Sequence, residues 1–389
     1  MKKILFVIPT LAHGGTNKSL ENILEFLKKY PYDISIYSIE LNQTRPYYQI
    51  FKKYLIIHKD RRIYNLINPI KKSGFNILYC GILKIFRSLC YLAKKDYTLY
   101  LCKKTAQHIN NNYDIVIGFQ EGIATILANF IPAQKKIAWV HCDYGVVTQS
   151  YKELYYNFNK IICVSEYTLN SFNSVLPHLS KRTKAIYNIV NSTLIFKKAN
   201  QIDNIGVNIN KRQFNIVSVG RIDYIKRFKE IPSIAYELQK RNIQFHWYII
   251  GDYNTQEGKE LIKNIERYKS TQYITLTGSR DNPYNIMNQC QLYVCLSISE
   301  ACPYVINEAR ILHLPIVCTD FPSSYEFIKN GENGFICQFE KITDTIANLI
   351  TDSTLYQQIK SNIKDFIYDN KIIEKNILSI LKDEENFDK

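Results

Sequence analysis

Residues 292–320 read LYVCLSISEACPYVINEARILHLPIVCTD and decide the fold. An apolar run opens the stretch, a helical pattern follows over YVINEARILH, and a second apolar run, LPIVCTD, closes it. Short apolar runs bounded by polar turns are typical of parallel strands, because helices cover both faces of a parallel sheet. The stretch therefore predicts a strand, a crossover helix and a second parallel strand.

The same alternation of strand and helix patterns extends over both halves of the chain. It predicts an α/β fold with doubly wound parallel sheets, in which ligands bind beyond the carboxyl ends of the strands. Further strand candidates are KILFVIP, DISIYSI, YDIVIGF, KKIAWVHC, KIICVSE, FNIVSVGR, FHWYIIGD and YITLTG. Further helix candidates are SLENILEFLKKY, FKEIPSIAYELQKR, GKELIKNIERYKS and DTIANLITD.

The length of 389 residues predicts two domains. The strand pattern lapses after residue 191, in the polar segment STLIFKKANQIDNIGVNINKRQ, and then restarts. We therefore expect a Rossmann-like domain over residues 1–195, a linker over 196–212 and a second Rossmann-like domain over 213–365. A C-terminal helix within residues 366–389 is expected to pack back on the first domain.

Composition excludes several classes of protein. The hydrophobic share of 46% allows a sizeable core, and the ten cysteines form no C-x-x-C pair, which favours reduced thiols over a metal site. The apolar run Ile4–Ile8 is short and ends at Pro9, which favours a buried strand over a signal peptide. We also find no run of about 18 apolar residues that would span a membrane. We therefore expect a cytoplasmic protein.

Positive charge gathers between Phe51 and His108. This segment holds thirteen Lys and Arg residues against Asp60 and Asp96, in a chain of net charge +15. The helical pattern over 78–95 places apolar and basic residues on opposite faces, which predicts docking on an anionic membrane surface. A core helix with a solvated charged face would show the same pattern. Aromatic RNA-binding motifs are not evident, so we expect no nucleic-acid partner.

Two carboxylates, Glu300 and Glu308, stand with seven residues between them. The first ends a strand-to-helix loop and the second lies on the predicted helix, so they address different parts of one elongated ligand. The backbone N–H groups around Pro303, Tyr304 and Val305 open this helix, where the partial positive charge favours a phosphate.

Three further segments carry residues suited to the same ligand. Arg221 and Lys226 follow a strand-ending glycine in VGRIDYIK, and two such cations stabilise a departing diphosphate. Gly14 and Gly15 allow close approach of the backbone, although HGGTNKS is not the G-x-G-x-x-G pattern of dinucleotide-binding proteins. His141 follows an apolar strand, and a neutral imidazole there can bond a sugar hydroxyl.

The motif around Glu300 resembles the signature of family 4 of the glycosyltransferases. That signature runs from a serine through Glu-Gly-Phe-Pro, a second Glu and a Gly-Pro-Val/Ile strand to a third Glu before an Asn-Gly turn. Glu326 and the turn Asn333-Gly334 fall at the expected places. Ala301-Cys302 replaces Gly-Phe, which leaves the donor sugar open, and His313-Leu314 replaces the usual glycine.

The resemblance implies the GT-B fold, with two Rossmann-like domains facing a cleft, and a retaining transfer. It assigns Arg221 and Lys226 to the diphosphate, Glu300 to the donor sugar and Glu308 to the ribose. It also implies that His141 contacts a donor-sugar hydroxyl. Gly14 and Gly15 would face the diphosphate and the acceptor, and the helix start at Pro303, Tyr304 and Val305 would bind the donor.

We therefore predict transfer from a nucleotide-sugar, expected to be a UDP-sugar, to a lipid-linked or surface-polysaccharide intermediate of capsule, O-antigen or exopolysaccharide synthesis. The basic segment places this activity at the inner face of the plasma membrane. Asp-x-Asp occurs nowhere in the chain, which favours catalysis without a metal ion or other cofactor. Two alternatives stay open: a non-catalytic protein that docks on membranes or nucleic acid, and a GT-B sugar-nucleotide epimerase.

Overall fold

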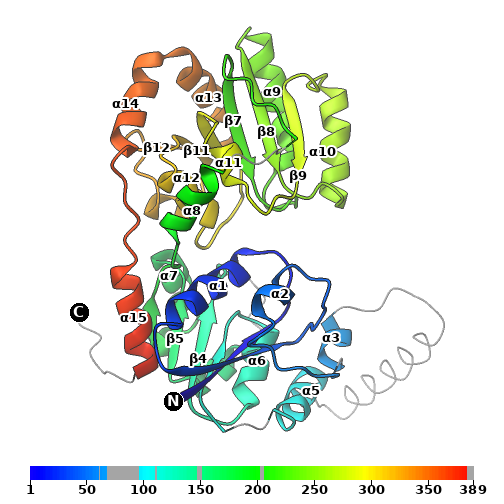
Figure 1. Cartoon of the computed structure of the whole chain (residues 1–389), viewed down its shortest axis with the longest axis vertical. Coiled ribbons are helices and arrows are strands. Elements are labelled where there is room, and N and C mark those ends of the chain that lie inside the picture. Colours follow the sequence, from blue (N-terminus) through cyan, green and yellow to red (C-terminus); the bar gives the residue numbers. More distant parts are fainter. Residues whose placement is uncertain (61, 68–95, 110–111, 147–150, 202–205, 383–389) are drawn as a thin grey trace, which may run out of the picture. The chain divides into compact units, whose positions relative to one another are not determined.

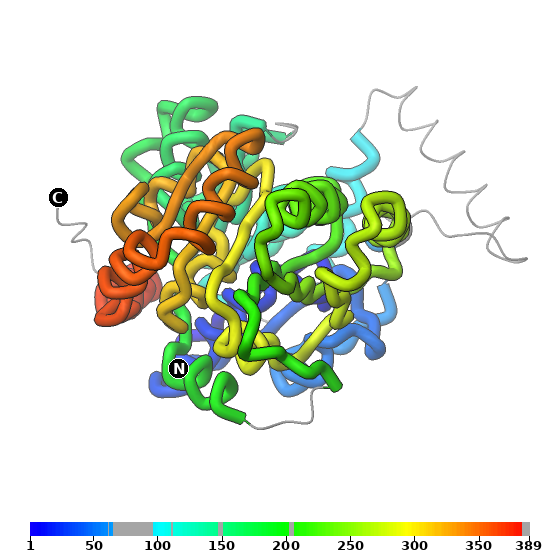
Figure 2. Tube along the Cα trace, turned by 90° about the horizontal axis from the view of Figure 1, so that it is seen from above, coloured from blue at the N-terminus to red at the C-terminus, as the bar shows by residue number. Residues whose placement is uncertain are grey.

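The computed structural model describes residues 1–60, 62–67, 96–109, 112–146, 151–201 and 206–382 (Figures 1 and 2). The chain divides into two compact units. The first comprises residues 1–189 together with 371–389, and the second comprises residues 190–370. Each unit is built on its own six-stranded sheet, so the predicted pair of doubly wound α/β folds is confirmed.

The sheet of the first unit has the strand order β2-β1-β3-β4-β5-β6, and all neighbours run parallel. Its strands are β1 (Lys2–Ile8), β2 (Tyr32–Ser38), β3 (Tyr113–Gly118), β4 (Ala133–Val140), β5 (Lys160–Cys163) and β6 (Thr183–Ala185). Its α-helices are α1 (Gly15–Leu27), α2 (Tyr47–Phe51), α3 (Arg62–Ile67), α5 (Tyr97–Ala106), α6 (Ile123–Phe130), α7 (Glu166–Val175) and α15 (Lys371–Lys382). Two 3-10 helices, η1 (Lys152–Asn157) and η2 (Pro177–Arg182), complete it.

The sequence patterns that predicted these elements correspond to their burial. Residues 4–8 of β1 are fully buried, as expected for a strand that helices cover on both faces. The predicted apolar face of α1 is also buried, through Leu20, Ile23, Leu24 and Leu27. Helix α1 follows β1 directly, so this face fixes the loop that leads out of the first strand.

The sheet of the second unit has the order β12-β11-β10-β7-β8-β9, again with parallel neighbours. Its strands are β7 (Phe214–Val219), β8 (Phe245–Ile250), β9 (Ile274–Gly278), β10 (Leu292–Cys295), β11 (Ile316–Thr319) and β12 (Gly334–Cys337). Its α-helices are α8 (Ser192–Ala199), α9 (Ile231–Lys240), α10 (Gln256–Arg267), α11 (Tyr284–Met287), α12 (Tyr304–Ile311), α13 (Ile342–Thr351) and α14 (Ser353–Ile363). The 3-10 helices are η3 (Phe228–Glu230), η4 (Pro322–Glu326) and η5 (Phe339–Lys341).

Strand order reverses once in each sheet. In open α/β sheets, ligands bind beside such a reversal, beyond the carboxyl ends of the strands. In the first unit the reversal lies between β1 and β3, because β2 was added on one side and all later strands on the other. In the second unit it lies between β7 and β10. The loops that follow these four strands are therefore the places to look for functional side chains.

The boundaries differ from those expected from sequence. The first crossing between units lies at residues 189–190 rather than after 195, and the second at 370–371 rather than after 365. Helix α8 runs across the predicted start of the linker at residue 196, and Asn191 caps it by accepting the Leu194 N–H at 2.9 Å. The Asn370 side chain bonds both the N–H and the C=O of Val190, at 3.1 and 2.8 Å, so the two crossings are joined at this point.

The C-terminal helix α15 belongs to the first unit. Three lysines of this unit donate to it: Lys2 to the Leu381 carbonyl at 3.1 Å, Lys135 to the Ile380 carbonyl at 2.6 Å, and Lys184 to Asn376 at 3.0 Å. Its apolar side chains Ile373, Ile377, Ile380 and Leu381 are buried. Helix α15 therefore buries its apolar face against the first unit.

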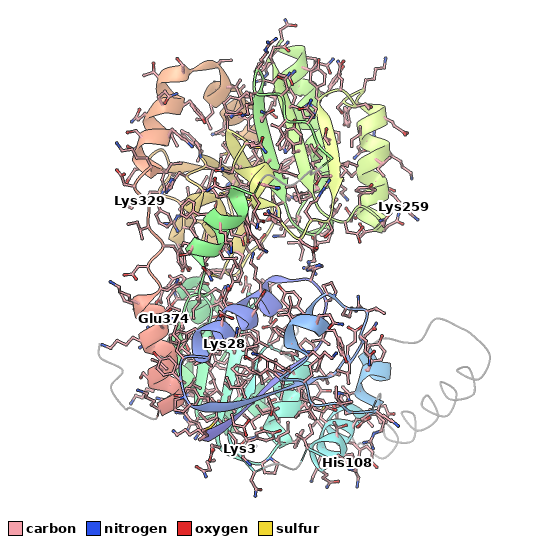
Figure 3. All side chains as sticks on the ribbon, in the orientation of Figure 1. Lys3, Lys28, His108, Lys259, Lys329 and Glu374 are labelled. Atoms are coloured by element: carbon pink, nitrogen blue, oxygen red, sulfur yellow. The ribbon has the colours of Figure 1, made fainter. Side chains whose placement is uncertain are left out.

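The basic helix predicted over residues 78–95 lies outside the described residues. The described flanks of the basic segment include α5, which carries Lys103 and Lys104 in its last turn and is followed by His108 (Figure 3). In the part of the chain that the structure describes, every helix is too short or too polar to cross a bilayer.

Candidate active site

The reversal in the second unit brings two predicted site residues into contact. Lys226 lies in the loop after β7 and Glu300 in the loop after β10, and the Lys226 ammonium forms an ion pair with Glu300 Oε1. Their side chains are 19% and 15% exposed. The site therefore holds a largely buried cation and anion side by side at the carboxyl end of the sheet.

Neighbouring groups hold this pair in place. Ser297 donates its hydroxyl to Glu300 Oε1 at 2.7 Å, and Ser323 donates to the Glu300 carbonyl at 2.6 Å. The Ile298 N–H bonds the Ile225 carbonyl at 2.8 Å, which joins the two loops directly. The glutamate is thus fixed through its side chain, its own backbone and the neighbouring loop.

The electrostatics of the site favour the charged form of Lys226. Burial lowers the pKa of Lys226, but the Glu300 carboxylate together with Cys295 and Asp223 outweighs burial, so this pKa is raised. A charged ammonium in a partly dry site attracts anions more strongly than one in water. The pair can therefore exchange partners when an anionic ligand with hydroxyl groups binds: the cation turns to the anion, and the carboxylate accepts from hydroxyls.

Arg221 follows strand β7, as Lys226 does, but it is not part of the Lys226–Glu300 ion pair. Its side chain is 69% exposed and its guanidinium lies 3.3 Å from Asp223. An exposed ion pair of this kind contributes little to stability, about 0–1 kcal/mol. Arg221 can therefore turn toward a phosphate at small cost.

Glu308 and the start of α12 form the rest of the predicted donor site. Helix α12 begins at Tyr304 with Pro303 as N-cap, and within the described residues no side chain caps it. Glu308 is 2% exposed and accepts the Tyr284 hydroxyl at 3.0 Å. Val305 lies in the first turn of the helix, so Pro303, Tyr304 and Val305 open it as predicted.

The first unit holds the remaining predicted residues. Gly14 is the N-cap of α1, which begins at Gly15, and no described side chain caps this helix start either. His141 follows β4, and its backbone N–H donates to Glu121 Oε2 at 2.7 Å. Glu121 in turn follows β3, so His141 and Glu121 come from adjacent strands beside the reversal.

Burial favours neutral side chains at this position. It lowers the pKa of His141 to about 3, because an imidazolium would lose its hydration. It also raises the pKa of the Glu121 carboxyl, although hydrogen bonds from the His141 backbone and from Cys142 act in the opposite direction. The Phe119 ring lies 4.8 Å from the imidazole and limits its rotation. His141 is therefore a neutral imidazole that lies against the Phe119 ring.

Asp143 lies two residues after His141, and its contacts are within the first unit. Its carboxylate accepts hydrogen bonds from Tyr167 and Ser171 on α7 and from the Gly145 N–H. These contacts fasten the loop after His141 to the next helix. We therefore assign Asp143 to the support of this loop.

Three residues near the site were not predicted from sequence: Glu121, Tyr284 and Ser297. Each contacts a predicted residue, but two of the three contacts join residues 20 and 24 positions apart in the chain. Only Ser297, three residues before Glu300, left a local signal. Among the described residues we find no cluster of three or more His, Cys, Asp or Glu side chains placed to hold a metal ion.

Comparison with known proteins finds similarity to glycosyltransferases. Residues 201–366 match the family model of the glycosyl transferases group 1. An uncharacterized glycosyltransferase of Haemophilus influenzae is 26% identical over 96% of this chain and 99% of its own length. A Campylobacter jejuni protein is 25% identical over 48% of this chain and 45% of its own length. Its name is N-acetylgalactosamine-N,N'-diacetylbacillosaminyl-diphospho-undecaprenol 4-alpha-N-acetylgalactosaminyltransferase.

Among solved structures, HepE of Anabaena in complex with UDP and glucose has a TM-score of 0.71. It is 17% identical and the match covers 98% of this chain and all of HepE, so it shows the fold. The fold, the family match and the relatives agree with one another. The second unit matches the glycosyl transferases group 1 model over most of its length, and the chain is a glycosyltransferase with the GT-B fold.

Proposed function

We propose that this glycosyltransferase moves a sugar from a UDP-sugar to a lipid-linked or surface-polysaccharide acceptor with retention of configuration. The observation that carries the proposal is the buried Lys226–Glu300 pair at the strand reversal of the second unit. A UDP-sugar offers this pair a diphosphate for the cation and sugar hydroxyls for the carboxylate. The Anabaena structure with UDP and glucose supports the choice of nucleotide.

Each candidate residue then has a role in the transfer. Lys226 and Arg221 stabilise the negative charge that grows on the diphosphate as the bond from the sugar to its oxygen breaks. Glu300 holds the donor sugar and Glu308 the ribose, while the open start of α12 at Pro303, Tyr304 and Val305 binds phosphate. An oxygen of the leaving diphosphate takes the proton of the acceptor hydroxyl, which attacks from the same face.

The first unit supplies groups for sugar and acceptor. His141, kept neutral by burial, donates or accepts a single hydrogen bond without adding charge beside the departing anion. Gly14 and Gly15 let the backbone at the start of α1 approach the diphosphate closely. Two cations in the second unit perform the task of a metal ion, so the proposed reaction needs none. We expect turnover to be unchanged in EDTA.

The acceptor is proposed from charge and from the relatives. The Campylobacter relative is named for a diphospho-undecaprenol substrate, which is a lipid-linked sugar. A staphylococcal relative is named for capsular polysaccharide biosynthesis. The thirteen basic residues between Phe51 and His108 suit an anionic membrane at its inner face. Flotation with anionic but not neutral vesicles would test this part alone.

The donor is tested first by thermal stabilisation with a panel of nucleotide-sugars. A ligand at about 100 times its Kd adds ~2.7 kcal/mol to stability. Turnover of the most stabilising donor is then measured for Glu308→Ala and Arg221→Ala. Both should lose most activity, and transfer that survives both changes would refute the assignment.

Matched controls come from α10, where Glu266 and Arg267 are exposed. Glu266→Ala and Arg267→Ala remove a carboxylate and a guanidinium there and should leave turnover intact. The anomeric configuration of the product, read by NMR, decides whether the transfer is retaining. Formation of an epimerised nucleotide-sugar without acceptor would instead favour the epimerase alternative.

A further inference from the structure

The loop between β1 and α1 needs support that its glycines cannot supply. Gly14 and Gly15 carry no side chain through which the turn might be held, and the first turn of α1 holds no acidic residue. Under the proposed function this turn faces the diphosphate, where a small displacement is costly for catalysis. Its position must therefore be set by the residues on either side of it.

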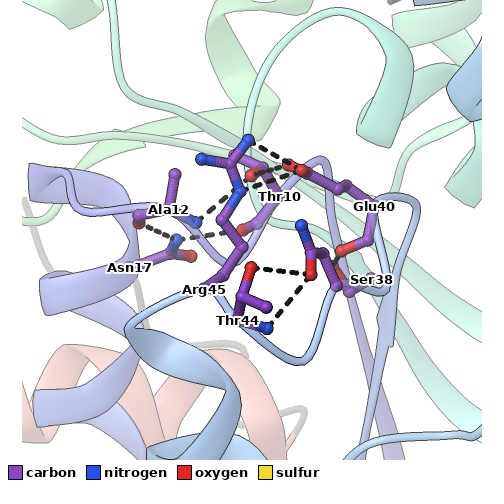
Figure 4. Close-up of polar contacts among 8 residues, drawn as sticks. Thr10, Ala12, Asn17, Ser38, Glu40, Thr44 and Arg45 are labelled. Carbon is purple, nitrogen blue, oxygen red and sulfur yellow. Dashed lines mark hydrogen bonds and ion pairs between the residues drawn. The ribbon is translucent and has the colours of Figure 1, made fainter.

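A chain of polar contacts runs from this loop into the sheet (Figure 4). Asn17, in the first turn of α1, donates to the carbonyls of Thr10 and Ala12 at 2.9 and 2.7 Å. The Ala12 N–H donates to the Thr10 hydroxyl at 3.2 Å, and that hydroxyl donates to Glu40 Oε2. Ala12 in the loop and Asn17 at the start of α1 are thus both bound to Thr10.

Glu40 is the anchor of this chain. It follows β2 and is only 5% exposed, so its charge must be paired. Arg45 meets Oε1 through Nε at 2.9 Å and Nη2 at 2.7 Å, while Oε2 accepts from Thr10. The Glu40 N–H bonds the Pro9 carbonyl at 2.9 Å, and Ser38 donates to the Glu40 carbonyl at 2.8 Å.

The carboxylate also fixes the direction of the hydrogen bonds. A carboxylate only accepts, so the Thr10 proton points to Glu40 and its lone pairs face the Ala12 N–H. A glutamine at position 40 would turn its amide NH₂ away from Arg45 and toward Thr10. The amide would then donate to the Thr10 oxygen beside the Ala12 N–H, the Thr10 proton would lose its acceptor, and the loop would lose its single arrangement.

We propose that Thr10, Glu40 and Arg45 are positioning residues for glycosyl transfer, which hold the Gly14-Gly15 turn in the arrangement that the departing diphosphate requires. The inference rests on the proposed function, since it assumes that this turn faces the donor. None of the three residues needs to touch the substrate. They act through Ala12 and Asn17, whose bonds fix the start of α1.

The test compares Thr10→Val, Thr10→Ser and Glu40→Gln in the full-length protein. Kinetics are measured with the UDP-sugar that stabilises the wild type most, and UDP affinity is measured by calorimetry. Thr10→Val and Glu40→Gln should lower kcat at least tenfold, with the Kd of UDP within twofold of wild type. Thr10→Ser keeps the hydroxyl and should restore kcat to within threefold.

Thr44→Val is the matched control. Thr44 lies in the same region (Figure 4), but it is exposed and its hydrogen bonds go to Asn42. It should behave as wild type. Equal kcat for Thr10→Val and Thr44→Val would overturn the inference and leave the proposed function standing. Parallel losses of kcat, UDP binding and melting temperature would also overturn it, because they would indicate a merely structural role. A wild type without turnover of any nucleotide-sugar would refute the proposed function itself.

Discussion

The two units have sheets of the same size with the same kind of strand reversal, yet the side chains at the two reversals differ in charge. In the second unit Glu300 raises the pKa of Lys226 and keeps it charged. In the first unit burial lowers the pKa of His141 to about 3 and raises that of Glu121. Under the proposed function, the second unit offers this charged pair to the leaving diphosphate, and the first unit offers the neutral His141 imidazole to a sugar hydroxyl.

The largest expected effect tests the charged side of this comparison. Lys226→Ala removes the cation from the diphosphate and leaves Glu300 buried without its partner. We expect kcat to fall by about 10²–10³, the loss typical of a group that stabilises developing negative charge. Lys259→Ala, at an exposed position on the outer face of α10 (Figure 3), is the control. Turnover of Lys226→Ala that matches the control would remove the basis of the comparison.

The second prediction concerns close backbone approach in each unit. A Cβ at Gly251 would lie 2.2 Å from the Gly220 carbonyl oxygen, and one at Gly118 would lie 2.8 Å from the Thr125 Cα. Alanine at either site should cost about 1–3 kcal/mol, with the larger loss at Gly251. Gly14→Ala meets nothing within 4 Å and should be nearly neutral. Unfolding in urea measures all three, and a stable Gly251→Ala would show that β8 can shift.

The third prediction concerns the hydrogen bond from Tyr284 to Glu308 in the second unit. Tyr284→Phe removes the hydrogen bond to Glu308, which is buried. UDP affinity should fall about fivefold to thirtyfold, or ~1–2 kcal/mol, because the carboxylate loses a charge-assisted bond that orients it. The affinity for 2′-deoxy-UDP should fall less. Tyr224→Phe, at a 65% exposed residue, provides the control. Equal losses for both nucleotides would separate Tyr284 from ribose recognition.

The smallest expected effect concerns His141, the neutral group of the first unit. The pKa of His141 is about 3 in the folded protein and about 6.5 when unfolded, so below pH 6.5 the unfolded chain binds more protons. Stability should therefore fall as the pH drops from 7 to 6, by somewhat less than ~1 kcal/mol relative to His141→Gln. Both proteins contain Glu121, whose raised pKa makes stability depend on pH in the opposite direction. Its contribution therefore largely cancels in the comparison. Identical pH profiles would show that the pKa of His141 does not change on folding.

Strands were easier to predict than the edges of the sheets and the joins between units. Buried strands such as β1 and β7 leave apolar runs that few other structures produce. Strand β6 has three residues, all partly exposed, and so leaves no such run. Helix α8 buries only Ile195 and Ala199, which is too little periodic signal to distinguish it from a linker.

The site was predictable where its chemistry is local. Glu300 and Glu308 lie on one short stretch, and a family resemblance there carries the assignment of the fold and the enzyme class. Glu40 contacts Thr10, which is 30 residues away, and Glu121 contacts His141, which is 20 residues away, so local spacing predicts neither contact. The sequence marks these two acids only by their positions just after the apolar runs of β2 and β3.

The bonds between Asn370 and Val190 bear on how the molecule can be divided. Because the two ends of the second unit meet there, residues 190–370 have the topology of an insertion into a host that is closed by α15. A single cut near residue 189 would leave the host without its last helix and expose Ile373, Ile377, Ile380 and Leu381 on the severed piece. Excising the insert and bridging residues 189 and 371 would instead keep both pieces whole.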